Sequence, residues 1–278
     1  MIRVGVVGAL GKMGRMVCGA VADDPDLNLV AAIDRSHMGE PIGPVIGRSD
    51  ISVKVADDMD TMLQAEVEVA VDFTHPEVVM SDVRWCIDHA VNVVVGTTGL
   101  TDADLRTIEA ALESEGGESN VFVAPNFAIG AVLAERFAVE AAGYFPAMEV
   151  IELHHDRKAD APSGTSLSVA RKMAAARAEA SQVPEDESVA GARGAEVDGI
   201  RVHSVRLPGL MAHEEIIFGG QGQTLTIRHD SLDRSSFMPG VVLAIKAVAT
   251  LSGLTVGLDE VLQLATSGSP VPGDERVH

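Results

Sequence analysis

The sequence is poor in aromatic and basic residues. One Trp, one Tyr and seven Phe occur among 278 residues, and 21 Lys and Arg stand against 41 Asp and Glu, which gives a formal net charge of −20. Nucleic-acid binding needs a basic face, and it often uses aromatic side chains on which bases stack. The composition therefore predicts no nucleic-acid partner. An acidic substrate would need a local group of cations.

Cysteine and long apolar runs are also scarce. Cys18 and Cys86 lie in helix-like stretches and form neither a CxxC pair nor a metal-ligand spacing, so we expect buried structural thiols and no metal site. No apolar run approaches the ~20 residues that span a bilayer. Residues 1–7 are typical of a strand rather than of a signal peptide. We expect a cytoplasmic protein with no membrane partner.

What the sequence contains is the pattern of a globular α/β protein. Hydrophobic residues make up 46% and charged residues 22%, and 278 residues are more than one domain usually needs. We predict a Rossmann-like parallel sheet in residues 1–127, with a C-terminal helix of about residues 238–278 packing back on it. Residues 128–237 are expected to form a second, α+β domain on a mixed sheet, for substrate binding and oligomerisation.

The second half has fewer helices than the first. A strand is expected around residues 148–151, a helix over residues 166–180 and a polar loop over residues 182–199. Three alternating strands follow, at residues 200–206, 213–218 and 223–229. These elements together predict the mixed sheet of the second domain.

A glycine-rich turn connects the first predicted strand to a helix. Gly8, Gly11 and Gly14 follow the apolar residues 2–7, and the helix runs to about residue 22. Without side chains, such a turn lets the backbone approach a pyrophosphate, with the helix amides pointing at it. Ala9 stands where the common G-x-G-x-x-G pattern has glycine, so a tight connection that binds nothing is the alternative.

An acidic residue ends the second strand at the spacing of a dinucleotide-binding unit. Residues 27–33 are apolar, and Asp34 follows them, twenty residues beyond Gly14. Asp34 would accept hydrogen bonds from ribose hydroxyls, which favours NAD, whereas Arg35 would pair with the 2′-phosphate of NADP. We therefore expect NADH and/or NADPH as cofactor, or a solvated turn as the plain alternative.

Three further strands, at residues 67–73, 91–95 and 121–123, end in turns. Ligands of parallel sheets lie at these carboxyl ends. The turns are residues 72–76, residues 96–99 and residues 124–127. The Gly- and Pro-containing residues 36–56 are expected to run over the surface, and their role stays open.

Residues 152–165 place two histidines, a lysine and a glycine-containing turn between a strand and a helix. His154 or His155 can act as general acid near neutrality, and Lys158 can hold a carboxylate or donate a proton. The helix start at residues 163–165 can bind a second carboxylate. A structural histidine and a solvated lysine are the plain alternatives. A metal site is a weaker alternative, and so is Ser163 as a nucleophile, because it lacks a G-x-S-x-G elbow.

These residues resemble one family closely. The segment 152–165, the glycine turn 8–14 and residues 96–98, 124–127 and 228–231 occur in the order found in the 4-hydroxy-tetrahydrodipicolinate reductases. These enzymes, also called dihydrodipicolinate reductases, belong to bacterial diaminopimelate and lysine biosynthesis. The resemblance extends over nearly the whole chain.

The resemblance implies hydride delivery from NAD(P)H to C4 of a cyclic imine after loss of the 4-hydroxyl group, in homotetramers built through the sheet of the second domain. His154 is implied as proton donor and acceptor and Lys158 as a second donor. The implied substrate is a small cyclic dicarboxylate, with His155, Gly164, Thr165 and the neighbouring Ser163 around it. The implied cofactor-binding residues are Gly8, Ala9, Leu10, Gly11, Lys12, Met13, Asp34, Arg35, Gly96, Thr97, Thr98, Ala124, Pro125, Asn126 and Phe127.

Two other functions are compatible with parts of the sequence. One is a two-domain amino-acid dehydrogenase, of aspartate or homoserine type, which would act on an open-chain substrate. The other is a cofactor-sensing regulator that keeps only the Rossmann half, although the acidic charge and the lack of a DNA-binding motif count against it.

Overall fold

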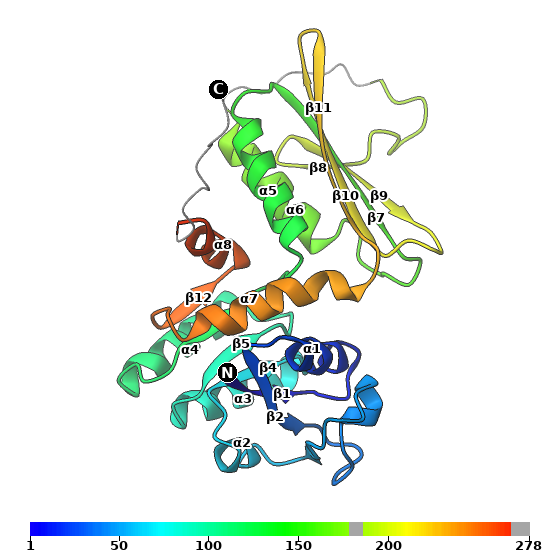
Figure 1. Ribbon diagram of the computed structural model, residues 1–278. Helices are drawn as coiled ribbons and strands as arrows, with labels where there is room; N and C mark the ends of the chain where they lie inside the picture. The colour runs from blue at the N-terminus through cyan, green and yellow to red at the C-terminus, as the bar shows by residue number, and fades with distance from the viewer. Residues whose placement is uncertain (178–185, 268–278) are drawn as a thin grey trace, which may run out of the picture. The chain divides into compact units, whose positions relative to one another are not determined.

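The structure is a computed structural model that describes residues 1–177 and 186–267. The chain forms two compact units: unit 1 comprises Met1–Phe127 and Phe237–His278, and unit 2 comprises Ala128–Ser236. Each unit has its own sheet (Figure 1). The predicted fold class, a Rossmann-like parallel sheet with a second α+β part on a mixed sheet, is confirmed.

Unit 1 contains a seven-stranded sheet in the order β12-β6-β5-β4-β1-β2-β3, with parallel neighbours throughout. Its elements are β1 (Ile2–Val7), α1 (Lys12–Asp23), β2 (Leu27–Ile33), the 3-10 helix η1 (Gly43–Ile46), β3 (Val55–Ala56), α2 (Thr61–Gln64), β4 (Val69–Asp72), α3 (Pro76–Asp88), β5 (Asn92–Val95), α4 (Asp102–Ser114), β6 (Val121–Val123), α7 (Met238–Val248), β12 (Leu254–Val256) and α8 (Leu258–Ser267).

Helices cover both faces of this sheet, which is why its strands are apolar on both sides (Figure 1). Helices α3 and α4 pack on one face, and α1 and α7 contact each other on the opposite one. Cys18 in α1 and Cys86 in α3 are buried free thiols, as predicted. Burial raises the pKa of Cys18 to about 12 and raises that of Cys86 as well, so both stay protonated.

The C-terminal part of unit 1 differs from the single helix predicted for residues 238–278. Helix α7 ends at Val248, and β12 then pairs in parallel with β6 before α8 begins. Gly253 and Gly257 flank β12 with positive φ values of 66° and 102°, which interrupt a helix. Residues 268–278 lie outside the described residues.

The predicted surface excursion of residues 36–56 agrees with the exposure of most of its residues. It also contains η1 and β3, which were not predicted, and β3 pairs with β2 at the edge of the sheet. Ile42 is fully buried, and its amide donates a hydrogen bond to the carbonyl of Val53. A buried apolar residue at a backbone turn anchors this segment, whereas most of its other side chains are exposed.

Unit 2 contains a five-stranded mixed sheet in the order β11-β10-β7-β9-β8. Its elements are α5 (Ile129–Ala142), β7 (Ala147–His154), α6 (Gly164–Ala176), β8 (Ala195–Val197), β9 (Ile200–Arg206), β10 (Ala212–Gly220), β11 (Gln223–Ser231) and the 3-10 helix η2 (Arg234–Phe237), whose last residue belongs to unit 1. Helices α5 and α6 lie side by side along one face of the sheet (Figure 1). The core between them contains Val150, Met173 and Phe218.

One prediction for unit 2 is confirmed and one needs correction. Helix α6 starts at Gly164, within the predicted helix start at residues 163–165, whereas the predicted loop of residues 182–199 contains β8. Strand β8 is short and mostly exposed, so it lacks the apolar alternation by which strands are recognised. Residues 178–180 of the predicted helix and 182–185 of the predicted loop lie outside the described residues.

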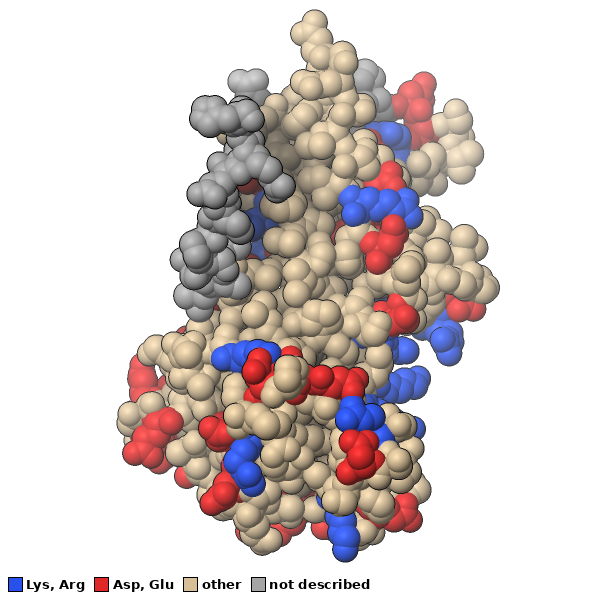
Figure 2. Space-filling view, in the orientation of Figure 1, with Lys and Arg blue, Asp and Glu red and all other residues tan. Residues whose placement is uncertain are grey.

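Several basic side chains on the surface are neutralised by neighbouring carboxylates. Arg48 pairs with Asp23 and Asp50, and Lys246 pairs with Asp24 and Asp26 at 2.8 and 2.7 Å. On the face in Figure 2, Lys and Arg side chains lie beside acidic ones rather than in one large patch. No described helix is long and apolar enough to cross a membrane.

Candidate active site

The glycine turn of unit 1 allows two backbone segments to touch. A side chain on Gly14 would place its Cβ 2.0 Å from the carbonyl oxygen of Gly8, and Gly8 itself has φ +74°. Gly11 is the N-cap of α1, and no side chain caps the described helix start, whose first turn contains no acidic residue. The first-turn amides of α1 are therefore available to an anion, which fits the pyrophosphate of a dinucleotide.

Asp34 connects the glycine turn to the end of β2. Its Oδ2 accepts a hydrogen bond from the amide of Leu10 at 2.9 Å, and its Oδ1 accepts from the amide and hydroxyl of Ser36 at 3.1 and 2.8 Å. Partial burial raises the pKa of Asp34, but these hydrogen bonds outweigh burial and hold it below its usual value. The ionised carboxylate retains lone pairs for ribose hydroxyls. Arg35, next to it, is exposed.

A pocket of about 300 Å³ lies at the carboxyl ends of the parallel strands. Seven residues predicted to bind the cofactor line it, together with Phe73 and Thr74 from the predicted ligand turn of residues 72–76 and with Phe237, which was not predicted. The lining residues are Met13, Phe73, Thr74, Gly96, Thr97, Thr98, Pro125, Asn126, Phe127 and Phe237. Of the remaining predicted cofactor residues, Ala9, Leu10 and Ala124 are buried, whereas Gly11 and Lys12 are exposed.

Asp72, at the end of β4, holds two turns of this pocket together. It is fully buried, and its Oδ1 accepts hydrogen bonds from the amide and hydroxyl of Thr74 at 3.0 and 2.8 Å and from the hydroxyl of Thr97 at 2.8 Å. On α3, burial and the adjacent Asp72 carboxylate raise the pKa of Asp82 to about 7. A proton on Asp82 then supplies the hydrogen bond between the two carboxyl groups.

In unit 2, the predicted proton donors lie where β7 ends. The Nδ1 atom of His154 contacts the carboxylate of Glu152, and Lys158 pairs with Asp160 at 2.8 Å. Burial lowers the pKa of His154 below its usual value; the Glu152 carboxylate opposes that shift, and the positive charge of Lys158 adds to it. His154 is therefore neutral at pH 7. The Nδ1 atom of His155 is buried and has no hydrogen-bond partner among the described residues.

At the start of α6, Ser163 is buried, whereas the two residues that follow it are exposed. The Ser163 hydroxyl is buried, accepts a hydrogen bond from the amide of Ser166 at 3.1 Å and lies 2.8 Å from the Ser166 hydroxyl. The predicted substrate residue Ser163 thus caps the helix. Gly164 and Thr165 are exposed, and a Cβ on Gly164 would meet nothing within 4 Å. Their first-turn amides form the accessible anion site.

Three charged residues of unit 2 were not assigned a role from the sequence. Glu152 and Glu214 are cross-strand neighbours in the β7–β10 register, and Arg206 pairs with His154 in the β7–β9 register. Glu152 could have been found from the sequence, because a glutamate at an inward-facing position of an amphipathic strand is unusual. Arg206 lies 52 positions beyond His154 and is brought to it only by the fold. Among residues 1–177 and 186–267, no cluster of His, Cys, Asp or Glu side chains fits a metal ion.

The chain combines a Rossmann unit, whose glycine turn is of the nucleotide-binding type, with a second unit that carries His154, Lys158 and the start of α6. This combination defines the class of two-domain nicotinamide-dependent oxidoreductases. The family description "Dihydrodipicolinate reductase, N-terminus" matches residues 2–127, and "Dihydrodipicolinate reductase, C-terminus" matches residues 130–262. The chain belongs to the dihydrodipicolinate reductase family and is an oxidoreductase with a nicotinamide cofactor.

Named relatives agree over nearly the full length. The chain is 48% identical to the 4-hydroxy-tetrahydrodipicolinate reductase of Mycolicibacterium smegmatis, over 95% of this chain and all of that one. It is 49% identical to the enzyme of the same name from Nocardia farcinica, over 95% and 99%. The solved structure of a dipicolinate-bound dihydrodipicolinate reductase from Paenisporosarcina sp. TG-14 matches with a TM-score of 0.83 at 42% identity, over 94% and 99%.

Proposed function

We propose that the protein reduces 4-hydroxy-tetrahydrodipicolinate to tetrahydrodipicolinate with loss of water, in the diaminopimelate route to lysine. The observation that carries this proposal is the cluster at the end of β7, where His154 and Lys158 lie within electrostatic range of each other. The first turn of α6 follows within ten residues. A proton donor, a cation and an anion-binding helix start suit a dicarboxylate that gains a proton on reduction.

Unit 1 is proposed to bind the nucleotide. The first-turn amides of α1 hold its pyrophosphate, Asp34 holds a ribose, and the turns of residues 96–98 and 124–127 surround the nicotinamide. The bound reduced nicotinamide supplies the hydride. Asp34 and Arg35 have opposite preferences for a 2′-phosphate, so we propose that both NADH and NADPH are accepted.

Unit 2 is proposed to bind the substrate and to supply the proton. The first-turn amides of Gly164 and Thr165, with the Thr165 hydroxyl, hold one carboxylate, and Lys158 and His155 lie toward the other. His154 exchanges the proton through Nε2, because its Nδ1 atom is engaged by Glu152. The ring takes up a proton on Nε2 and, once protonated, donates it to the substrate. The Paenisporosarcina relative was solved with dipicolinate, a dicarboxylate, and this supports the substrate class.

A homotetramer is proposed for the assembled enzyme. The face of the second sheet that points away from α5 and α6 carries Ile151, Leu153 and Ile217, and all three are partly exposed. Apolar side chains on such a face are typical of subunit interfaces. Light scattering on the purified protein tests the tetramer, and a monomer at micromolar concentration would contradict it.

The activity is tested by adding the enzymatically prepared cyclic substrate to the purified protein and following the oxidation of NADH and of NADPH. Saturable oxidation is expected. Oxidation or reduction only with aspartate or homoserine would favour the amino-acid dehydrogenase alternative, which the relatives do not favour. His154→Ala and Lys158→Ala are each expected to abolish turnover while nucleotide affinity stays within about twofold, and unchanged turnover in both contradicts the mechanism.

A further inference from the structure

Glu152 is a charged side chain with no exposed surface. It lies on β7, two residues before His154, on the face of the sheet that α5 and α6 cover. The strand register places Ser204 of β9 and Glu214 of β10 on either side of it. Burial of a carboxylate is costly unless its oxygens are fully engaged, so its partners indicate what it does.

Both oxygens of Glu152 are engaged by the groups next to the site. Arg206 donates from Nη1 to Oε2 and from Nη2 to Oε1, each at 2.8 Å, and Oε2 also contacts Nδ1 of His154. Arg206 Nη2 donates in addition to the carbonyl of Asp160 at 2.6 Å. Asp160 in turn pairs with Lys158. One carboxylate therefore connects His154 to the loop that carries Lys158.

The charge state of Glu152 determines which nitrogen of His154 carries a hydrogen. Burial raises the pKa of Glu152, but hydrogen bonds from Arg206, Ser204 and His154 outweigh burial and hold the pKa below its usual value. An ionised carboxylate can only accept, so Nδ1 of His154 carries the hydrogen toward it. The Nε2 atom is then the one that exchanges a proton.

We propose that Glu152 is the positioning residue for His154, holding its ring in the Nδ1–H tautomer and stabilising the protonated ring, with Arg206 keeping Glu152 ionised. This inference rests on the proposed role of His154. The charged groups near His154 are Glu152 on its own strand, Arg206 on β9 and Lys158 on the following loop. With Glu152 neutralised, two cations and no anion act on the ring, and its proton is lost at lower pH.

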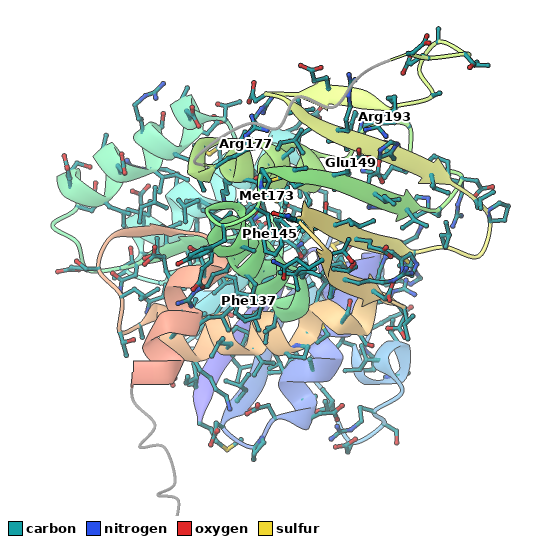
Figure 3. All side chains as sticks on the ribbon, turned by 90° about the horizontal axis from the view of Figure 1, so that it is seen from above. Phe137, Phe145, Glu149, Met173, Arg177 and Arg193 are labelled. Carbon is teal, nitrogen blue, oxygen red and sulfur yellow. The ribbon has the colours of Figure 1, made fainter. Side chains whose placement is uncertain are left out.

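Glu152→Gln is the test variant, because it keeps the size of the side chain and removes the charge. Glu149→Gln is a matched control: Glu149 lies on the same strand, on the opposite face, where it pairs with Arg193 and lies 2.8 Å from His203 (Figure 3). Both variants thus remove a carboxylate from a Glu–His–Arg group. Gel filtration verifies that both variants retain the wild-type assembly.

The measurements are the pKa of His154, from NMR of histidine-labelled protein, and kcat and KM against pH. Glu152→Gln is expected to move the pKa of His154 down by about one unit and to lower kcat about 10- to 100-fold, as the loss of a group that orients a metal-bound histidine does in metalloenzymes. KM should stay within threefold, and Glu149→Gln should match the wild type in all three quantities. A lower kcat with an unmoved His154 pKa indicates a structural role and overturns the inference.

A second variant covers the case in which Glu152→Gln does not fold. Arg206→Lys keeps the positive charge but loses the two-pronged contact with Glu152, and it is expected to shift the pH profile of kcat and to lower kcat. An unchanged profile overturns the inference. Failure of the proposed function can be told apart from failure of this inference. If the proposed function is wrong, His154→Ala remains active, and the NMR titration still reports whether Glu152 sets the pKa of the His154 ring.

Discussion

The hydroxyl of Ser166 donates a hydrogen bond to the carboxyl group of Glu214, and this pair lies directly behind the cap of α6. Ser166 also contacts Ser163, so the buried chain Glu214, Ser166, Ser163 connects β10 to the helix start at which a substrate carboxylate is proposed to bind. A charge on Glu214 would act on that helix start through two hydroxyl groups.

Glu214 should make the stability of the protein depend on pH. Burial raises its pKa from 4.5 to about 7. Because the pKa of Glu214 is higher in the folded state than in the unfolded state, the protonated carboxyl group stabilises the folded protein. This contribution is complete below pH 4.5 and is lost as the pH rises to about 7. We expect the Tm of the wild type to fall between pH 4.5 and 8 by a few degrees more than the Tm of Glu214→Gln. Thermal unfolding of both proteins at both pH values measures this difference in Tm. An equal decrease in Tm for the wild type and Glu214→Gln would contradict the raised pKa of Glu214.

Asp72 should control nucleotide affinity although it does not line the pocket. Asp72→Ala leaves the donors of Thr74 and Thr97 without their acceptor, and each lost hydrogen bond costs about 1 kcal/mol. We expect NADH to bind about tenfold more weakly in a fluorescence titration. Asp82→Asn is the control, because its amide still donates to Asp72 and should leave affinity within twofold. Equal NADH affinities for the wild type and Asp72→Ala would show that nucleotide binding does not depend on the hydrogen bonds from Thr74 and Thr97 to Asp72.

Gly14→Ala should damage the nucleotide turn, whereas Gly19→Ala in the same helix should not. The added Cβ would lie 2.0 Å from a backbone oxygen at position 14, and it would meet nothing within 4 Å at position 19. Gly19→Ala is expected to raise the stability by about 0.5–1 kcal/mol through helix propensity. Gly14→Ala is expected to lose NADH binding and to unfold at lower denaturant concentration, and chemical denaturation of both variants provides the comparison.

Asp34 and Arg35 should shift the nucleotide preference in opposite directions. Asp34→Ala removes the carboxylate that repels a 2′-phosphate, and Arg35→Ala removes a cation that attracts it. We expect the ratio of NADPH to NADH affinity to rise about tenfold in the first variant and to fall about tenfold in the second. Calorimetric titration with both nucleotides measures the two ratios. A shift in the same direction in both variants would contradict this division of roles.

The sequence predicted the elements of unit 1 well because strand, turn and helix there depend on neighbours in the chain. The predicted strands at residues 27–33 and 121–123 agree with the structure, and so does the predicted strand at residues 200–206 of unit 2. Prediction failed where long-range pairing decides. Strand β12 has three residues and forms because it extends the sheet beside β6, and β8 forms because it pairs with β9.

The residues that carry the proposed chemistry, His154, Lys158 and the glycine turn, follow from the sequence alone. The proton chemistry of a histidine or lysine side chain and the bareness of a glycine turn are local chemical properties. Only the tertiary structure decided how they are supported. Glu152 and Glu214 are cross-strand neighbours, yet the pKa of Glu152 is held below its usual value beside Arg206 and the pKa of Glu214 is raised to about 7 beside Ser166. That difference depends on burial and on partners from distant segments, which strand pairing and the packing of α6 on the sheet bring together.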